Sequence, residues 1–153
     1  MQSGSYKGLK ILFAALLAGQ LLFAGLASVL IMTKGAMSKT SDLENTLLPV
    51  VVIVALICAV FGMRMFKART QNVNDVQQSL TQRFIEYRAA NILRWALLEG
   101  PCMFAIIGFM LTGNYLFLLI TGILLLLFMS TAPKKEKVCI NLGISQEELD
   151  TIV

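Results

Sequence analysis

A single carboxylate inside an apolar run is the side chain of this sequence best placed to do chemistry. Glu99 is the only charged residue of Trp95–Thr112. A charge at the centre of a membrane costs about 2.5–3.5 kcal/mol on insertion scales, so we expect Glu99 to be protonated, paired or beside water. Gly100 and Pro101 follow it. Because proline has no N–H for the carbonyl of Leu97, we expect a kinked helix with a free acceptor beside the carboxyl group.

Glu99 has two interpretations. As a polar clasp, it holds helices together through a side chain of another span. As an ion or proton site, it works beside the proline-weakened helix. Arg94 is five residues earlier, about 140° around a helix, and is therefore a poor partner within that helix. We prefer the clasp, for which the expected partners are Gln20, Ser28 and Thr121. The candidate intramembrane polar site comprises Glu99, Pro101, Gln20 and Arg94.

The remaining reactive residue types are sparse. The chain has no histidine and three cysteines, which excludes the usual zinc sites and every histidine-based acid–base mechanism. Cys58 and Cys102 lie in apolar runs and Cys139 lies in the tail, so we expect no structural disulfide. No nucleophile–base pair is visible. We therefore expect no enzyme activity, no cofactor and no metal site.

Long apolar runs dominate the composition, which is 57% hydrophobic and only 14% charged. A helix needs about 20 apolar residues to cross a hydrocarbon core of about 30 Å, and about 17–25 are observed. The first run is too long and too lightly charged in front for a cleaved signal peptide, so we expect it to be retained. The four runs that qualify as spans are Ile11–Met32, Leu47–Met63, Trp95–Thr112 and Tyr115–Ala132.

Basic residues are distributed unevenly if all four runs cross a membrane. Eleven Lys and Arg residues then fall on one side, and only Lys34 and Lys39 fall on the other. By the positive-inside rule both termini are cytoplasmic, and we expect a bacterial inner membrane as the location. The net charge of +4 then reflects topology, and we expect no nucleic-acid partner.

The first span resembles the third, residue against residue. Tyr6–Ala24 and Tyr87–Ala105 are offset by 81 positions and are identical at nine of 19 positions. The second and fourth spans align more weakly, with Phe61 matching Phe128. Because both units would enter from the same side, we expect a duplicated two-helix hairpin in parallel orientation. Small residues recur one turn apart in both copies, as in Ala15 and Gly19, and we expect them to bring the first and third spans together at the centre.

These patterns predict an all-α membrane protein with four transmembrane helices arranged as two repeated helical hairpins. Between the hairpins, apolar residues at helical spacing predict a cytoplasmic amphipathic connector, joined to the third span as one helix from about Asn74. In the tail, Ser145 and Glu148 form a capping box for a short cytoplasmic helix, Gln146–Ile152, after a linker containing Pro133 and the turn residue Gly143. The expected divisions are residues 1–65 (spans at about 9–32 and 47–65), 66–90 (connector), 91–132 (spans at about 91–112 and 115–132) and 133–153 (tail).

The expected function is that of a small polytopic membrane protein of structural or accessory type. Its expected partners are the lipid bilayer and either further copies of itself or another membrane protein. The alternative is an ion- or proton-coupled transporter or channel component that uses Glu99.

Overall fold

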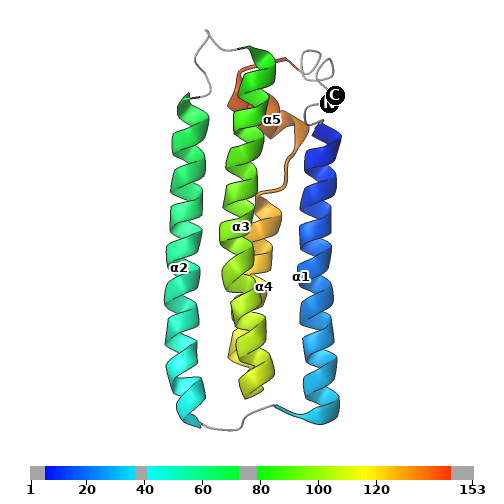
Figure 1. The fold of residues 1–153 in the computed structure, drawn as a ribbon, viewed down its shortest axis with the longest axis vertical. Coiled ribbons are helices and arrows are strands. Elements are labelled where there is room, and N and C mark those ends of the chain that lie inside the picture. The colour runs from blue at the N-terminus through cyan, green and yellow to red at the C-terminus, as the bar shows by residue number, and fades with distance from the viewer. Residues whose placement is uncertain (1–5, 37–40, 73–78, 146–153) are drawn as a thin grey trace.

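The computed structural model describes residues 6–36, 41–72 and 79–145. Within these residues all regular structure is helical. The long helices lie side by side (Figure 1). In chain order, the helices are α1 (Tyr6–Lys34), α2 (Ser41–Asn72), α3 (Leu80–Thr112), α4 (Tyr115–Ser130) and α5 (Lys135–Leu142).

Three of these helices, α1, α2 and α3, are long and apolar enough to cross a membrane. The fourth apolar run forms a shorter helix than expected, because α4 has 16 residues and therefore spans about 24 Å at about 1.5 Å per residue. It qualifies only together with α5, from which it is bent by 64°. The chain is thus a helical protein compatible with an integral membrane location.

Helix direction alternates along the chain. Tyr6, at the start of α1, donates a hydrogen bond to the carbonyl of Pro133 beyond α4, and Phe66 near the end of α2 contacts Tyr87 near the start of α3. The starts of α1 and α3 therefore lie at one end of the protein with the end of α2, and α4 runs toward that end but stops well short of it (Figure 1). We call this the basic end, since most of the Lys and Arg residues belong to it. The other end is called the opposite end.

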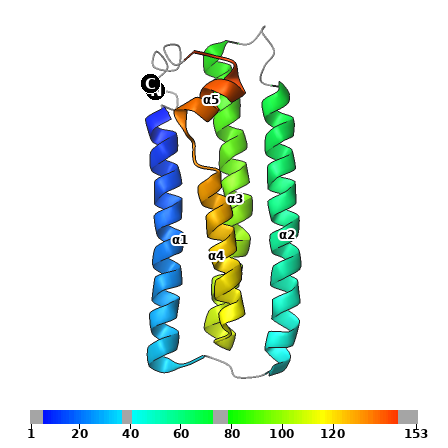
Figure 2. The same cartoon turned by 180° about the vertical axis from the view of Figure 1, so that it is seen from behind.

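α3 is the centre of the arrangement. It contacts α1, α2, α4 and α5, whereas α1 and α2 make no contact with each other in the described part of the chain. In both views α1 and α2 lie on opposite sides, with α3 and α4 between them (Figures 1 and 2).

The expected layout of two equivalent hairpins is therefore not confirmed. Helix directions agree with it, but α3 packs on α4 while α1 does not pack on α2. The connections account for the difference. Only residues 113–114 separate α3 from α4, which forces those helices to be neighbours, whereas residues 35–40 separate α1 from α2 and can bridge a wider gap.

The expectation that small residues join the first and third spans is wrong. Ala15 and Gly19 on α1 and Ala96 and Gly100 on α3 are all exposed on the protein. A Cβ atom added at Gly19 or Gly100 would meet nothing within 4 Å. Larger residues, among them Trp95 and Leu98, fill the interior instead.

The turn between α3 and α4 follows directly from two residues. Gly113 ends α3 in the left-handed conformation, with φ 72°, and its N–H donates to the Phe109 carbonyl. Asn114 caps α4, since its side-chain oxygen accepts a hydrogen bond of 2.8 Å from the Leu116 N–H. This is the connection that the sequence predicts.

The connector and the tail differ from their expected bounds. α2 continues past residue 65 to Asn72, and α3 begins at Leu80; the expected start near Asn74 lies outside the described residues. In the tail, residues 135–142 form a helix where we expected a linker. Gly143 ends that helix with φ 62° and so acts as its C-terminal cap. The expected helix Gln146–Ile152 lies outside the described residues.

Candidate functional site

The clasp expected at Glu99 does not form. Glu99 is half-buried on α3 and makes no hydrogen bond or ion pair with any described residue. Two of its expected partners bond to their own helices: the Ser28 hydroxyl donates to the Ala24 carbonyl at 2.8 Å, and the Thr121 hydroxyl donates to the Phe117 carbonyl at 2.9 Å. A half-buried carboxylate without a protein partner remains available to a proton, a cation or another molecule.

Gln20, the third expected partner, is the least satisfied polar side chain of the interior. It is 1% exposed, and neither its amide nitrogen nor its amide oxygen has a hydrogen-bond partner in the part of the chain that the structure describes. An unpaired buried polar group costs about 1–3 kcal/mol. The unpaired amide of Gln20 therefore either lowers the stability of the fold or forms hydrogen bonds with an ion or molecule that binds beside it.

Helix register places Gln20 in a polar layer. The Phe13 ring stacks on Phe128 at 4.9 Å and lies 5.2 Å from Trp95, which aligns α1, α3 and α4 at one depth. Seven residues further toward the opposite end, about 10 Å along each helix, the same helices carry Gln20, Cys102 and Thr121. All three residues are buried. Glu99 lies about one turn from this layer, on the side of the basic end.

Pro101, which also belongs to the expected site, is buried inside α3. The helix runs without interruption from Leu80 to Thr112. The proline therefore removes one backbone hydrogen bond, to the Leu97 carbonyl, without breaking the helix in two.

Arg94 belongs to a different group of residues from Glu99. Its Nη2 atom donates to the Asn91 side-chain oxygen at 2.8 Å and to the Thr131 carbonyl at 3.2 Å. Its guanidinium lies 3.9 Å from the centre of the Phe66 ring, as a cation–π contact. Its Nε atom is buried with no hydrogen-bond partner. The structure thus separates Arg94 from Glu99 and brings it to the junction of α2, α3 and α4.

Arg94 lines a pocket of about 290 Å³ at the basic end, which we call the basic pocket. The walls come from α2, α3, the end of α4 and α5. Two of the lining side chains are cations and none is a carboxylate. The lining residues are Phe66, Tyr87, Arg94, Ser130, Thr131, Ala132, Lys137, Ile140 and Asn141.

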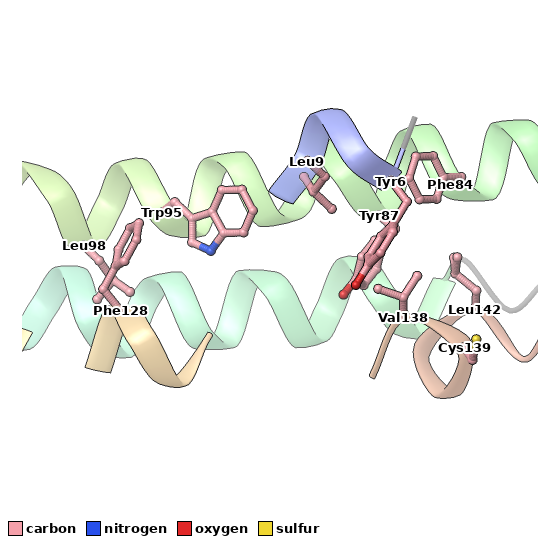
Figure 3. Close-up of a cluster of buried hydrophobic side chains, with 10 residues drawn as sticks. All are labelled: Tyr6, Leu9, Phe84, Tyr87, Trp95, Leu98, Phe128, Val138, Cys139 and Leu142. Atoms are coloured by element: carbon pink, nitrogen blue, oxygen red, sulfur yellow. The ribbon is translucent and has the colours of Figure 1, made fainter. Parts of the chain in front are cut away.

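α5 forms one wall because the interior of the basic end holds it in place. Val138, Cys139 and Leu142 of α5 are buried in a cluster with aromatic residues of α1 and α3 (Figure 3). The Tyr6 hydroxyl donates to the Pro133 carbonyl at 2.8 Å. Arg83 donates a hydrogen bond to the Leu142 carbonyl. These contacts fix the chain segment that follows α4 across the end of the bundle (Figure 2).

A second hydrogen-bond network fixes the floor of the pocket. The Trp95 indole N–H donates to the Thr131 hydroxyl at 3.0 Å, and that hydroxyl donates to the Phe128 carbonyl. Asn91 is fully buried and donates to the Tyr87 carbonyl at 2.9 Å, which holds its oxygen toward Arg94. Arg94 is therefore positioned on both sides before anything binds.

Sequence reasoning missed Asn91, Thr131 and Lys137 as members of a site with Arg94. Asn91 carried a usable signal, since it precedes Arg94 by three residues and so lies on the same helix face. Thr131 and Lys137 carried none, because their approach depends on the bend after α4. No group of three or more His, Cys, Asp or Glu residues within the described ranges could hold a metal ion.

The chain was compared with protein-family models, with curated proteins and with solved structures, and none of the three comparisons found a match.

Proposed function

We propose that this chain is a four-span integral membrane protein that acts as an accessory subunit and associates with a second copy of itself through the outer face of α1. The basic end is cytoplasmic in this proposal. The observation that carries it is the exposure of α1. Only four residues of this 29-residue helix are buried: Tyr6, Leu9, Gln20 and Ala27.

The outer face of α1 has the residue types that favour helix pairing in a membrane. Ala14, Ala18 and Gly25 are exposed, with Ala18 one turn after Ala14 and Gly25 two turns after Ala18, and Ala15 and Gly19 are exposed beside them. Small residues let two backbones approach closely, which maximises van der Waals contact where the hydrophobic effect gives no driving force. Large exposed residues such as Leu22 lie close to these small residues on the same helix, and they would fill the grooves of a neighbouring helix.

A second copy is the favoured occupant because the face can pair with itself. Small residues recur over at least three turns of α1. If two copies are related by a two-fold axis along the membrane normal, with their α1 helices facing each other, small residues of one copy lie opposite small residues of the other. The face carries no charge between Lys10 and Lys34, which leaves nothing to repel an identical helix.

Matched glycine substitutions test the association. Gly19→Leu puts a large side chain in the contact and should convert the associated form to monomer. Gly100→Leu makes the same change at the equivalent position of α3, which is also exposed, and should leave association intact. Crosslinking in native membranes and light scattering in mild detergent give the readouts. Monomer for the unmodified chain, or equal effects of the two variants, would reject the α1 interface.

Orientation has a separate test. In a background without the native cysteines, Lys67→Cys should be labelled by a membrane-impermeant maleimide from the cytoplasmic side only. Asp42→Cys should be labelled from the other side only, because of the 11-to-2 distribution of basic residues. Labelling of both positions from one side would overturn the proposed topology.

A second candidate function is ion- or proton-coupled transport. It is supported by the unpartnered Glu99 and by Gln20 with both amide atoms unpaired about one turn away in depth. If this function holds, Glu99→Gln should abolish proton- or cation-driven flux in proteoliposomes while the protein stays folded. Gln20→Met should also reduce flux. If neither variant differs from the unmodified chain in any ion gradient, the transporter is rejected and Gln20→Met should simply stabilise the fold.

A further inference from the structure

The basic pocket combines a half-buried cation, Arg94, with a shortage of protein partners. Arg94 has no carboxylate partner among the described residues. Its charge is compensated only by two neutral oxygens and by the Phe66 ring. Removing a charge from water without a counter-charge costs several kcal/mol in a protein interior. An anion in the pocket would offset that cost.

Further donors converge on the same space. Lys137, on the first turn of α5, is exposed. Its Nζ atom donates to the Ser130 carbonyl at 3.1 Å and makes no other hydrogen bond or ion pair with a described residue. The Tyr87 hydroxyl has no hydrogen-bond partner among the described residues. Asn141 adds a side-chain amide to the lining. An arginine, a lysine and neutral donors around a site without carboxylates favour a phosphate group, which accepts several charge-assisted hydrogen bonds at once.

The depth of the pocket identifies the source of that phosphate. The apolar run of α4 ends at Ser130, beside the pocket, and Trp95 lies directly beneath it with its indole N–H on Thr131. Where an apolar run ends, a membrane-spanning helix leaves the hydrocarbon core and enters the headgroup region. The lining also contains apolar side chains, Phe66 and Ile140, and Ile140 is 76% exposed. A phospholipid offers both a phosphate group that can bind the cations and an acyl chain that can pack against these apolar side chains.

The geometry points to a binding site for the phosphate headgroup of an anionic phospholipid, held by Arg94 and Lys137 between α2, α3 and α5. Basic pockets between transmembrane helices at the membrane surface are a recurring form of lipid recognition. The site does not depend on association through α1, because none of its lining residues lies on that helix.

Trp95 provides a built-in reporter, since it is the only tryptophan of the chain and its hydrogen-bond partner Thr131 lines the pocket. The purified full-length protein, in detergent micelles, is titrated with phosphatidylglycerol, with phosphatidylcholine and with inorganic phosphate. We expect a saturable change in Trp95 fluorescence with phosphatidylglycerol only. A response to inorganic phosphate with none to phosphatidylglycerol, or equal responses to the two lipids, would overturn the lipid assignment.

Charge-removing variants locate the binding site. Lys137→Gln changes an exposed side chain, so it should fold normally and weaken phosphatidylglycerol binding about fivefold, the value of one basic residue near a lipid surface. Arg94→Gln should weaken binding by more than Lys137→Gln, because Arg94 is half-buried and held in place by charge-assisted hydrogen bonds, whereas Lys137 is exposed. The matched control is Lys67→Gln, which removes an exposed charge of the same end outside the pocket and should leave binding within about twofold. If Lys137→Gln and Lys67→Gln weaken binding equally, the pocket is not the site.

Discussion

α1 and α3 turn equivalent faces toward the rest of the protein, yet α3 lies at its centre and α1 at its edge. Of the nine positions identical between them, seven have the same degree of exposure. Tyr6 and Tyr87 are both buried, and Gly19 and Gly100 are both exposed. The similarity of the two helices therefore extends to which face points inward. It does not extend to the surroundings of the two helices, since α3 packs on α1, α2 and α4, whereas α1 lies at the edge of the bundle and does not pack on α2 within the described residues.

The difference shows that the position of a helix in a bundle decides how deeply the same residue is buried. Leu98 of α3 is buried, whereas the identical Leu17 of α1 is only half-buried, and Ala105 and Ala24 differ in the same way. A helix surrounded on several sides buries its flanking positions, and a helix at the edge buries only one narrow stripe. Paired substitutions at repeat positions can measure that difference.

The largest expected difference concerns the leucine pair. Leu98→Ala should lower the free energy of unfolding by about 2–5 kcal/mol, because it leaves a cavity among packed side chains. Leu17→Ala should cost clearly less, since lipid or detergent can fill the space at the edge. Reversible unfolding in mixed micelles measures both. Equal losses would show that α1 is as enclosed as α3, which an additional helix packed on α1 would produce.

An intermediate effect is expected from two glycines of α3. A Cβ atom at Gly108 would lie 2.7 Å from Cδ1 of Phe117, a ring that is fully buried. Gly108→Ala should therefore destabilise the protein by about 1–3 kcal/mol through overpacking of the α3–α4 contact. Gly100→Ala meets nothing within 4 Å and should be neutral or stabilising by up to about 1 kcal/mol. Thermal unfolding of the two variants should move in different directions; a stabilised Gly108→Ala would mean that α3 and α4 are less closely packed.

The smallest expected effect is the difference in stability between variants of the two equivalent tyrosines, Tyr6 and Tyr87. Tyr6→Phe removes the hydrogen bond to Pro133 and should cost about 0.5–1.5 kcal/mol, because a buried carbonyl loses its donor. Tyr87→Phe removes a hydroxyl that has no partner among the described residues, so the stability of the lipid-free protein should hardly change. Denaturant titrations and protease sensitivity of the segment after α4 provide the measurements. A greater loss for Tyr87→Phe would place an unseen partner on its hydroxyl.

Much of the local structure could be predicted from the sequence. The apolar runs predicted the helices that are long and apolar enough to cross a membrane, and the bounds of the last two runs left only residues 113–114 between them, where the structure has the turn between α3 and α4. The helix at residues 135–142 was missed because Gly143 was interpreted as a turn before a helix, while it caps the end of one. Glycine in a left-handed conformation serves both situations, so the residue type alone does not decide between them.

The candidate site shows the same division. Sequence alone determined that Glu99, Gln20 and Arg94 are costly inside an apolar environment, since the energetic penalty depends only on residue type and depth. The sequence did not determine which face points inward, because the small-residue face expected at the centre is exposed in both related helices. Which helices are neighbours was decided only by the tertiary structure. Side-chain packing placed Arg94 against Phe66 and Thr131, and left Glu99 and Gln20 without hydrogen-bond partners among the described residues. Such contacts join residues far apart in sequence, and no local pattern encodes which of several compatible surfaces will meet.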